Sequence, residues 1–363
     1  MMFTRTLARW FPVPRTLSPL ASGVDISDTS IKWLTLAPAA DGSRIVNYGS
    51  HDIGPDIVQT GAIRNADALA DALKEVKKQG RVVAAHAALP EEGAYVFSMH
   101  VHPGSSRAQI TSMIEFELEG RVPIPPKQAV YDFDFVGARG DAGEEIAVTV
   151  FPRELAEGYI EAFSKSGIEL VSLEIEARSI GRAVSPAEHN PVTLLVDCGK
   201  ARTGVAILKN GIPIFTSTVD IGGDHMSRAL MEALSISEED ALQFKNEHGL
   251  VPDDPKLQKG FEAVDKVASG LAEEIARHYR FWDTHRTKSA QNSGVERVFL
   301  VGGNVNLKGF PEYIAGKVHA FTERPNVWCN VFSFDDYIPS IPYRASFQYA
   351  TAIGLALRSV ASV

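Results

Sequence analysis

The feature of this sequence that most restricts its fold is a pattern that occurs twice, in halves of similar length. An apolar strand contains an aspartate near its end, a short polar turn follows, and two further strands are joined by a glycine-containing turn. In the first copy, the strand at 23–26 contains Asp25, the turn spans 27–30, and a strand at 31–36 leads to Asp41-Gly42. Because Asp-Gly pairs favour tight hairpins, this segment predicts three adjacent antiparallel strands.

The second copy is centred on Asp197, 172 positions after Asp25. A strand at 192–196 precedes this aspartate, the turn spans 198–203, and the strand at 204–208 leads to Asn210-Gly211. One such unit could arise by chance. Two units predict duplicated lobes, each of which offers one acid and one polar turn to a shared cleft.

The two turns have a clear chemical use. Successive N–H groups of a tight turn can surround phosphate oxygens, and carboxylates at strand ends can hold a hydrated Mg²⁺ that bridges those phosphates. Lys32 adds a compact cation beside the first turn. Either hairpin taken alone would be interpreted as an ordinary β-turn.

Two glycine pairs strengthen the phosphate interpretation. Gly222-Gly223 follows a strand and precedes a helical run at 226–234, which places a helix N-terminus at a strand exit. Gly302-Gly303 and Asn304 follow the apolar strand 298–301, where the backbone can approach a flat base closely. The order of acid turn, acid turn, glycine pair and glycine pair is more specific than any one of them.

Composition excludes several classes of protein. The 363 residues are 45% hydrophobic and 22% charged, which is typical of a folded α/β protein of two or three domains. The net charge of −9 disfavours nucleic acid as a partner. Two cysteines are too few for a disulfide framework and favour the cytoplasm, and no apolar run is long enough to cross a membrane.

The first 20 residues form a basic leader with Arg5, Arg9 and Arg15 and no acid. Three prolines interrupt any secretory apolar region, so the leader is not a signal peptide. Phe3, Leu7, Trp10 and Phe11 would fall on one helical stripe, which leaves a weak interfacial helix open. A mobile leader, or a short helix packed on the body, is the simpler interpretation.

The order of these motifs resembles the ATPase domain shared by actin, Hsp70 and sugar kinases. The region between the copies resembles the inserted 1C (SHS2) subdomain of the FtsA and PilM branch. The helix at 105–120, with its ending FELEGRVPIPP, and the closing segment at 347–358 are especially similar to PilM. The resemblance covers roughly residues 21–358 and implies an α/β, actin-like (ribonuclease H-like) fold of two lobes with an FtsA/PilM-type insert.

The resemblance divides the chain into five parts. The basic leader (1–20) is followed by lobe 1, or 1A (21–88 with 169–190 and 341–363), the insert 1C (89–168), lobe 2, or 2A (191–234 with 295–340), and subdomain 2B (235–294).

The resemblance also implies ATP and Mg²⁺ as ligands, with Mg²⁺ held by Asp25 and Asp197 through water. Glu274 and Arg277 would lie beside the purine and ribose, or Glu273 and Arg280 if the register differs. The residues implied to bind nucleotide are Asp25, Ser27, Thr29, Ser30, Lys32, Asp197, Gly199, Arg202, Thr203, Gly222, Gly223, Glu274, Arg277, Gly302, Gly303 and Asn304.

The chain departs from the family pattern at both turns. Ser27 replaces the usual glycine of the first loop, and Asp28 stands where a hydroxyl usually contacts phosphate, so Asp28 adds a negative charge there. Lys200 in the second turn could offset that charge. Glu174 and Glu176 are candidates for orienting an attacking water, and we expect at most a slow ATPase in which nucleotide is structural or acts as a switch.

The function implied by the resemblance is that of a cytoplasmic, ATP-binding component of the type IV pilus inner-membrane platform, at the inner face of the cytoplasmic membrane. Its partners would be the N-terminal tail of a PilN-like bitopic membrane protein, bound in a nucleotide-dependent complex, and other platform proteins, with membrane association through them. The alternatives are a small-molecule kinase of the same superfamily and an FtsA-like division protein. A kinase usually has a larger insert or second lobe that forms the acceptor pocket, and no amphipathic helix follows the closing segment at Arg358 as FtsA would require.

Other motifs favour structural roles. His100 and His102 would lie on one face of a strand, but no third ligand stands at a fixed spacing, so exposed strand histidines are the preferred interpretation over a metal pair. Neither a Rossmann glycine motif nor a Walker A motif is present in the sequence.

Overall fold

The computed structural model of this protein describes residues 20–39, 42–137, 144–186, 191–252, 254–285 and 294–360. The leader predicted at 1–20 lies outside these ranges except for Leu20, and so does Asp41 of the first hairpin turn.

A five-stranded sheet forms the centre of the first lobe. Its strand order is β10-β6-β1-β2-β3. β1 pairs antiparallel with β2 and β2 with β3, whereas β6 is parallel to both β1 and β10. The strands are β1 (Ser22–Ile26), β2 (Ser30–Ala39), β3 (Gly42–Asp52), β6 (Ala84–Leu89) and β10 (Glu169–Ile175).

A second five-stranded sheet has the order β13-β12-β11-β14-β15. β11 pairs antiparallel with β12 and β12 with β13, and β14 is parallel to β11 and to β15. The strands are β11 (Thr193–Cys198), β12 (Thr203–Lys209), β13 (Ile212–Val219), β14 (Arg297–Val301) and β15 (Thr322–Glu323).

The two sheets therefore share one topology. In each, the first strand lies at the centre, with its two antiparallel hairpin partners on one side and two strands parallel to it on the other. This is the structural form of the repeat in the sequence. Asn210 and Gly211, which join β12 to β13, have φ values of 52° and 71°, as a two-residue turn of type I′ requires. We call the first sheet with its helices lobe 1 and the second lobe 2.

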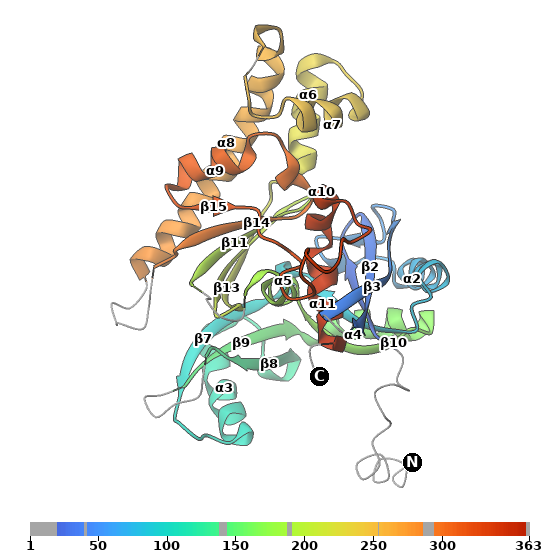
Figure 1. Ribbon diagram of the computed structural model, residues 1–363. Helices are drawn as coiled ribbons and strands as arrows, with labels where there is room; N and C mark the ends of the chain where they lie inside the picture. The colour runs from blue at the N-terminus through green and yellow to red at the C-terminus, as the bar shows by residue number, and fades with distance from the viewer. Residues whose placement is uncertain are drawn as a thin grey trace.

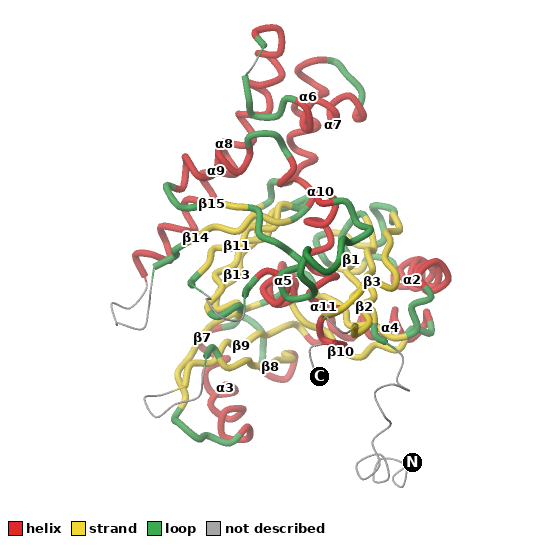
Figure 2. Tube along the Cα trace, viewed as in Figure 1, coloured by secondary structure: helices red, strands yellow, loops and turns green. Residues whose placement is uncertain are grey.

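Four helices cover lobe 1. α2 packs against α4 and α5 packs against α11, and the two pairs lie on the sheet (Figure 2). β1 and β6 are buried at every residue, as strands covered on both faces are. The helices are α2 (Ala66–Gly80), α4 (Arg153–Ser166), α5 (Glu176–Val184) and α11 (Ala350–Val360), with the short elements β4 (Val58–Gln59), β5 (Ala62–Ile63), α10 (Tyr343–Ser346) and η6 (Phe347–Tyr349).

α11 lies unusually close to its neighbours because glycines stand at the contacts. An added Cβ on Gly354 would lie 1.8 Å from the carbonyl oxygen of Ser179 on α5. One on Gly23 in β1 would lie 2.0 Å from the carbonyl oxygen of Ala352. Backbone thus meets backbone at both contacts, so no side chain larger than hydrogen fits at either position.

Helices also cover lobe 2, and α6 and α7 project beyond its sheet (Figure 1). Ser237 caps α7 by accepting from the Asp240 N–H, as its place before the acidic run predicts. The helices are α6 (Gly223–Leu234), α7 (Glu238–Glu247), α8 (Gln258–His285) and α9 (Phe310–Val318), with the short turns η4 (Pro255–Leu257) and η5 (Gly303–Asn306).

A three-stranded antiparallel sheet, β7-β9-β8, interrupts lobe 1 between β6 and β10 and has its own apolar core under α3. Figure 1 shows it at the opposite end of the molecule from α6 and α7. The helix predicted at 105–120 is α3, which begins with a capping box of Ser106 and Gln109. The elements are η2 (Glu91–Gly93), β7 (Tyr95–Val101), α3 (Arg107–Arg121), η3 (Pro126–Gln128), β8 (Ala129–Phe135) and β9 (Glu144–Pro152).

Contacts brace this inserted sheet against both lobes. Arg178 of α5 binds Asp134 of β8 at 2.8 Å, and Lys209 at the end of β12 binds Glu145 of β9 at 2.6 Å. In the described part of the chain, no helix is long and apolar enough to span a membrane.

Candidate functional site

A cleft of about 850 Å³ lies where the first turns of the two lobes meet. Both copies of the sequence repeat contribute to it, together with residues from the ends of β6 and β14 and from α7. Of the residues predicted to bind nucleotide, those that line this cleft are Asp25, Ser27, Thr29, Ser30, Lys32, Asp197, Gly199, Arg202, Gly223, Gly302, Gly303 and Asn304.

The turn after β1 is closed by its own hydroxyl groups. The Ser27 N–H donates to the Ser30 carbonyl at 2.9 Å, while the Ser27 Oγ accepts from the backbone N–H of Ser30 at 3.1 Å and of Thr29 at 3.4 Å. Lys32, which faces Asp25 across the strand pair, donates to the Ser30 Oγ at 2.8 Å. The donors predicted to bind phosphate are therefore engaged within the turn, and a phosphate would replace these bonds.

The turn after β11 is tied to the start of α6. The Gly223 N–H donates to the Gly199 carbonyl at 3.1 Å, and the Asp224 N–H donates to the Lys200 carbonyl at 2.9 Å. A Cβ on Gly222 would lie 2.5 Å from the backbone of this turn, so only glycine allows the approach. Gly222 supports the turn from behind and does not line the cleft.

The glycine loop after β14 is held against the same turn. Asn304 donates from its Nδ2 to the Gly199 carbonyl at 2.7 Å, which makes it a support for the turn. Gly302 has a φ of 92°, and a Cβ on it would lie 2.5 Å from the Asp197 Oδ1. At Gly303, in contrast, an added Cβ would meet nothing within 4 Å, so this residue faces open space in the cleft.

Four carboxyl groups, which we call the acidic cluster, line the floor of the cleft: Asp25 and Glu91, which are buried, and Glu176 and Asp197, which are half-buried. Burial and, to a lesser extent, the negative charge of Asp25 together raise the pKa of Asp197 to about 7. Burial likewise raises the pKa of Glu91 to about 8, although the Ala177 N–H donates to this carboxylate at 2.7 Å. Crowded acids of this kind are stabilised by a cation or by protons.

The chemistry of the acidic cluster suits a divalent cation with oxygen ligands. Among the described residues, no group of three or more metal-ligating side chains could hold an ion. Mg²⁺ keeps several of its waters in protein sites, so Asp25 and Asp197 fit as ligands that act through water.

Sequence reasoning missed Glu91, which follows Leu89-Pro90 at the carboxyl end of the buried strand β6. That position was the available signal, because ligands of open α/β sheets bind beyond the carboxyl ends of strands. The segment 174–176 was predicted to hold water-orienting acids, and only Glu176 lines the cleft. Glu174 instead binds Arg182 at 2.5 Å and the Ser179 Oγ at 2.8 Å.

Asp28 has a different partner from the one expected. Its carboxylate accepts from the Arg202 Nη2 at 2.6 Å and from the N–H groups of Thr60 and Gly61 at 3.1 Å each. Lys200 lines the cleft, but the cation that offsets Asp28 in this structure is Arg202. Sequence spacing could not show this, because the two residues belong to different lobes.

The helix predicted to flank the purine lies elsewhere. Glu274 and Arg277 on α8 bind each other and do not line the cleft. Thr203, which was also predicted to bind nucleotide, does not line the cleft either, and its hydroxyl donates to the Ile221 carbonyl at 2.7 Å. One wall of the cleft comes from α7, where Lys245 is buried and donates from its Nζ to the Gly223 carbonyl at 3.1 Å. Burial lowers the pKa of Lys245, while the charge of Asp224 opposes that change.

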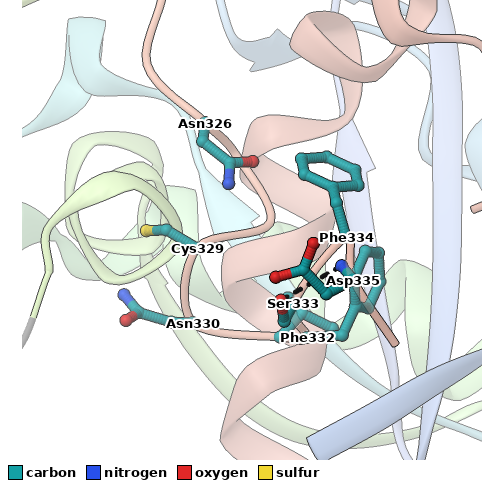
Figure 3. Close-up of a pocket in the computed structure, with 8 residues that line it drawn as sticks. Asn326, Cys329, Asn330, Phe332, Ser333, Phe334 and Asp335 are labelled. Atoms are coloured by element: carbon teal, nitrogen blue, oxygen red, sulfur yellow. Dashed lines mark hydrogen bonds between the residues drawn. The ribbon is translucent and has the colours of Figure 1, made fainter. Parts of the chain in front are cut away.

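A second, more open cavity of about 590 Å³ lies along the segment that follows β15 (Figure 3). Its polar side chains serve structural bonds: Asn330 donates to the carbonyls of Arg182 at 2.9 Å and Ser185 at 2.7 Å. Cys329 donates from its Sγ to the Ala183 carbonyl at 3.1 Å, and although the residue as a whole is exposed, desolvation of its thiol raises the pKa to about 11. A protonated, bonded thiol is a poor nucleophile, so we assign no chemistry to this cavity.

A family model described as "Type IV pilus assembly protein PilM" matches residues 23–360. Among curated proteins, ethanolamine utilization protein EutJ of Escherichia coli (strain K12) is 30% identical over 118 residues, which are 32% of this chain and 36% of that protein. The chain thus spans about a third of the length of this curated relative.

Two solved structures show the fold. The PilM-PilN type IV pilus biogenesis complex matches with a TM-score of 0.76 at 20% identity, covering 96% of this chain and 99% of the other. EutJ from Carboxydothermus hydrogenoformans matches with a TM-score of 0.53 at 17% identity, covering 95% and 91%. The predicted fold class, an actin-like α/β fold of two lobes, is confirmed.

Proposed function

We propose that this chain, which belongs to the PilM family of type IV pilus assembly proteins, binds ATP and Mg²⁺ in the cleft between its lobes and uses the bound state to recognise a membrane partner. The partner we propose is the short cytoplasmic N-terminal tail of a PilN-like bitopic protein of the inner membrane. On this proposal the chain is cytoplasmic, contacts other platform proteins, and reaches the inner face of the membrane through its partners.

One observation carries the nucleotide part of the proposal. Two turns from different lobes and the glycine loop after β14 converge on one cleft that also contains buried acids and the cations Lys32 and Lys245. Such a convergence of turns, acids and cations suits one small polyanion together with its metal ion. Structural roles alone do not require the open space at Gly303.

Each part of the cleft has a proposed task. Asp25 and Asp197 hold the waters of Mg²⁺, which supplies positive charge to the phosphates. Lys32 stands beside the first turn and Lys245 beside α6, where both can offset phosphate charge. Gly303 leaves room for the flat face of the base.

We propose at most slow hydrolysis. Glu176 lines the cleft and is the acid that we propose for orienting a water, but burial and the charge of Asp25 raise its pKa well above the usual value. A carboxyl group held protonated is a weak general base, so turnover at neutral pH should be slow. The nucleotide then acts as a structural or switching ligand.

The inserted sheet is the proposed site for the peptide tail. Its strands β7, β8 and β9 do not line the cleft, it has its own core, and it is braced to both lobes by Arg178–Asp134 and Lys209–Glu145. On this proposal, a change in the angle between the lobes reaches the inserted sheet through these two ion pairs. The PilM-PilN complex among the similar structures supports a partner of this kind.

A titration of the purified chain tests the proposal. A peptide from the N-terminus of the neighbouring bitopic protein is added with and without ATP and Mg²⁺, and phosphate release is measured in parallel. Saturable binding that requires nucleotide, with little phosphate release, is expected. Asp197→Ala should abolish Mg²⁺-dependent ATP binding, while Asp336→Ala, an exposed acid outside the cleft, should not. Unchanged ATP affinity in Asp197→Ala would show that the cleft is misplaced.

A further inference from the structure

An ion-pair bridge crosses the cleft between the lobes. Arg202 lies in the turn after β11 of lobe 2, and its guanidinium binds Asp28 at 2.6 Å and Glu92 at 2.7 Å. Asp28 lies in the turn after β1 of lobe 1, and Glu92 lies in η2, where the chain passes from β6 of lobe 1 into the inserted sheet. All three side chains line the cleft.

The Asp28 carboxylate is held in lobe 1 by bonds that do not involve Arg202. Both of its oxygens accept backbone N–H groups, from Thr60 and Gly61, at 3.1 Å. Gly61 is itself anchored, because its carbonyl accepts from the buried hydroxyl of Tyr159 at 3.1 Å. The acceptor is therefore rigid, and Arg202 is the member of the bridge that can leave.

The bridge is partly shielded from water. The side chains of Arg202, Asp28 and Glu92 are 15%, 17% and 20% exposed. One guanidinium is shared by two carboxylates, so this part of the cleft carries excess negative charge. A phosphate that enters this site is repelled unless it takes Arg202 from its carboxylates.

We propose that Arg202 is a phosphate-responsive latch: Asp28 and Glu92 hold it across the cleft, and nucleoside di- and triphosphates bind by displacing it from them. This inference rests on the proposed nucleotide function and adds its regulation. Arginine suits this exchange because its planar fork binds phosphate and carboxylate with the same geometry. A nucleoside without phosphates does not compete for Arg202.

The sign of a mutational effect distinguishes a latch from a structural brace. Loss of one carboxylate frees Arg202 for phosphate and removes repulsion, so Asp28→Asn and Glu92→Gln should each bind ATP more tightly than the unaltered chain. We expect a gain of about fivefold or more, which is at the lower end of typical coupling between sites. Adenosine affinity should not change. A brace would give the opposite result, because its loss would loosen the site.

The test measures ATP and adenosine affinity by calorimetry for the unaltered chain and both variants, with urea unfolding as a check that each variant folds. Asp71→Asn is the matched control, since it removes the same charge from a lobe 1 ion pair outside the cleft, Lys74–Asp71. Tighter ATP binding with unchanged adenosine binding supports the latch.

Two other outcomes are distinguishable. Unchanged or weaker ATP binding in both folded variants, with normal binding by the unaltered chain, overturns the latch and leaves the proposed function standing. Absence of ATP binding in the unaltered chain and in every variant overturns the proposed function, and the latch with it.

Discussion

The contact between α5 and α11 allows a stability prediction that can be worked from distances. In Gly354→Ala the new Cβ would lie 1.8 Å from the Ser179 carbonyl oxygen, whereas ordinary contacts begin at 3.4 Å. The two helices would have to separate by about 1.6 Å. Gly354 also accepts from the Arg182 Nη1 at 2.9 Å, and that bond would be strained as well.

We expect Gly354→Ala to lower the free energy of unfolding by about 2 kcal/mol or more, because overpacking costs exceed the ~1 kcal/mol that alanine gains over glycine within a helix. Gly316→Ala in α9 is the matched control, since its Cβ would meet nothing within 4 Å and it should stabilise the chain by about 0.5–1 kcal/mol. Urea unfolding of both variants measures the difference. If Gly354→Ala proved as stable as Gly316→Ala, the close contact of α5 and α11 would be refuted.

Three further predictions concern charge and access. Burial raises the pKa of Glu174, but Arg182 and Arg358 outweigh this effect and lower the pKa from 4.5 to about 2. The ionised carboxylate therefore contributes about 3 kcal/mol to the free energy of unfolding above pH 4.5, and this contribution is lost as the pH falls toward 2. Glu174→Gln should remove it, so that stability measured by urea unfolding falls less steeply in acid. Gly303→Ala should leave stability within about 0.5 kcal/mol of the unaltered chain and weaken ATP binding, and equal affinity would place the base elsewhere. Lys245→Met should weaken ATP binding about tenfold, and calorimetry that detects no loss would remove α7 from the site.

The fold was predictable because its signals are local. A strand, an acid and a tight turn can be recognised in a segment of about ten residues, and the recurrence of this pattern at Asp25 and Asp197 predicted two related sheets. The order of the strands then follows from antiparallel hairpins and parallel crossovers, which have few alternatives. The insert was predicted from the resemblance of this region to the FtsA and PilM branch, and its helix begins with a capping box of Ser106 and Gln109.

The site was predictable only in part, because the missing facts are long-range. Nothing local distinguishes α7 from α8 as the wall of the cleft, so Lys245 was overlooked while Glu274 was favoured. The partner of Asp28 depends on how far apart the lobes stand, and that distance is a property of the whole fold. Ser27 shows a further limit: its hydroxyl closes its own turn, a choice that the residue type allows without requiring it.

The position of α11 in lobe 1 has a consequence for how the chain folds during its synthesis. This helix packs on β1, and Ser359 donates to the Ala21 carbonyl across 338 positions of the chain. Lobe 1 is therefore incomplete until its last helix has been synthesised, on the order of tens of seconds after β1 at typical translation rates. The strands of lobe 2, all within 193–323, can assemble during that interval. The nascent chain should thus fold its second half first, with the apolar strands β1 and β6 still in need of cover by chaperones.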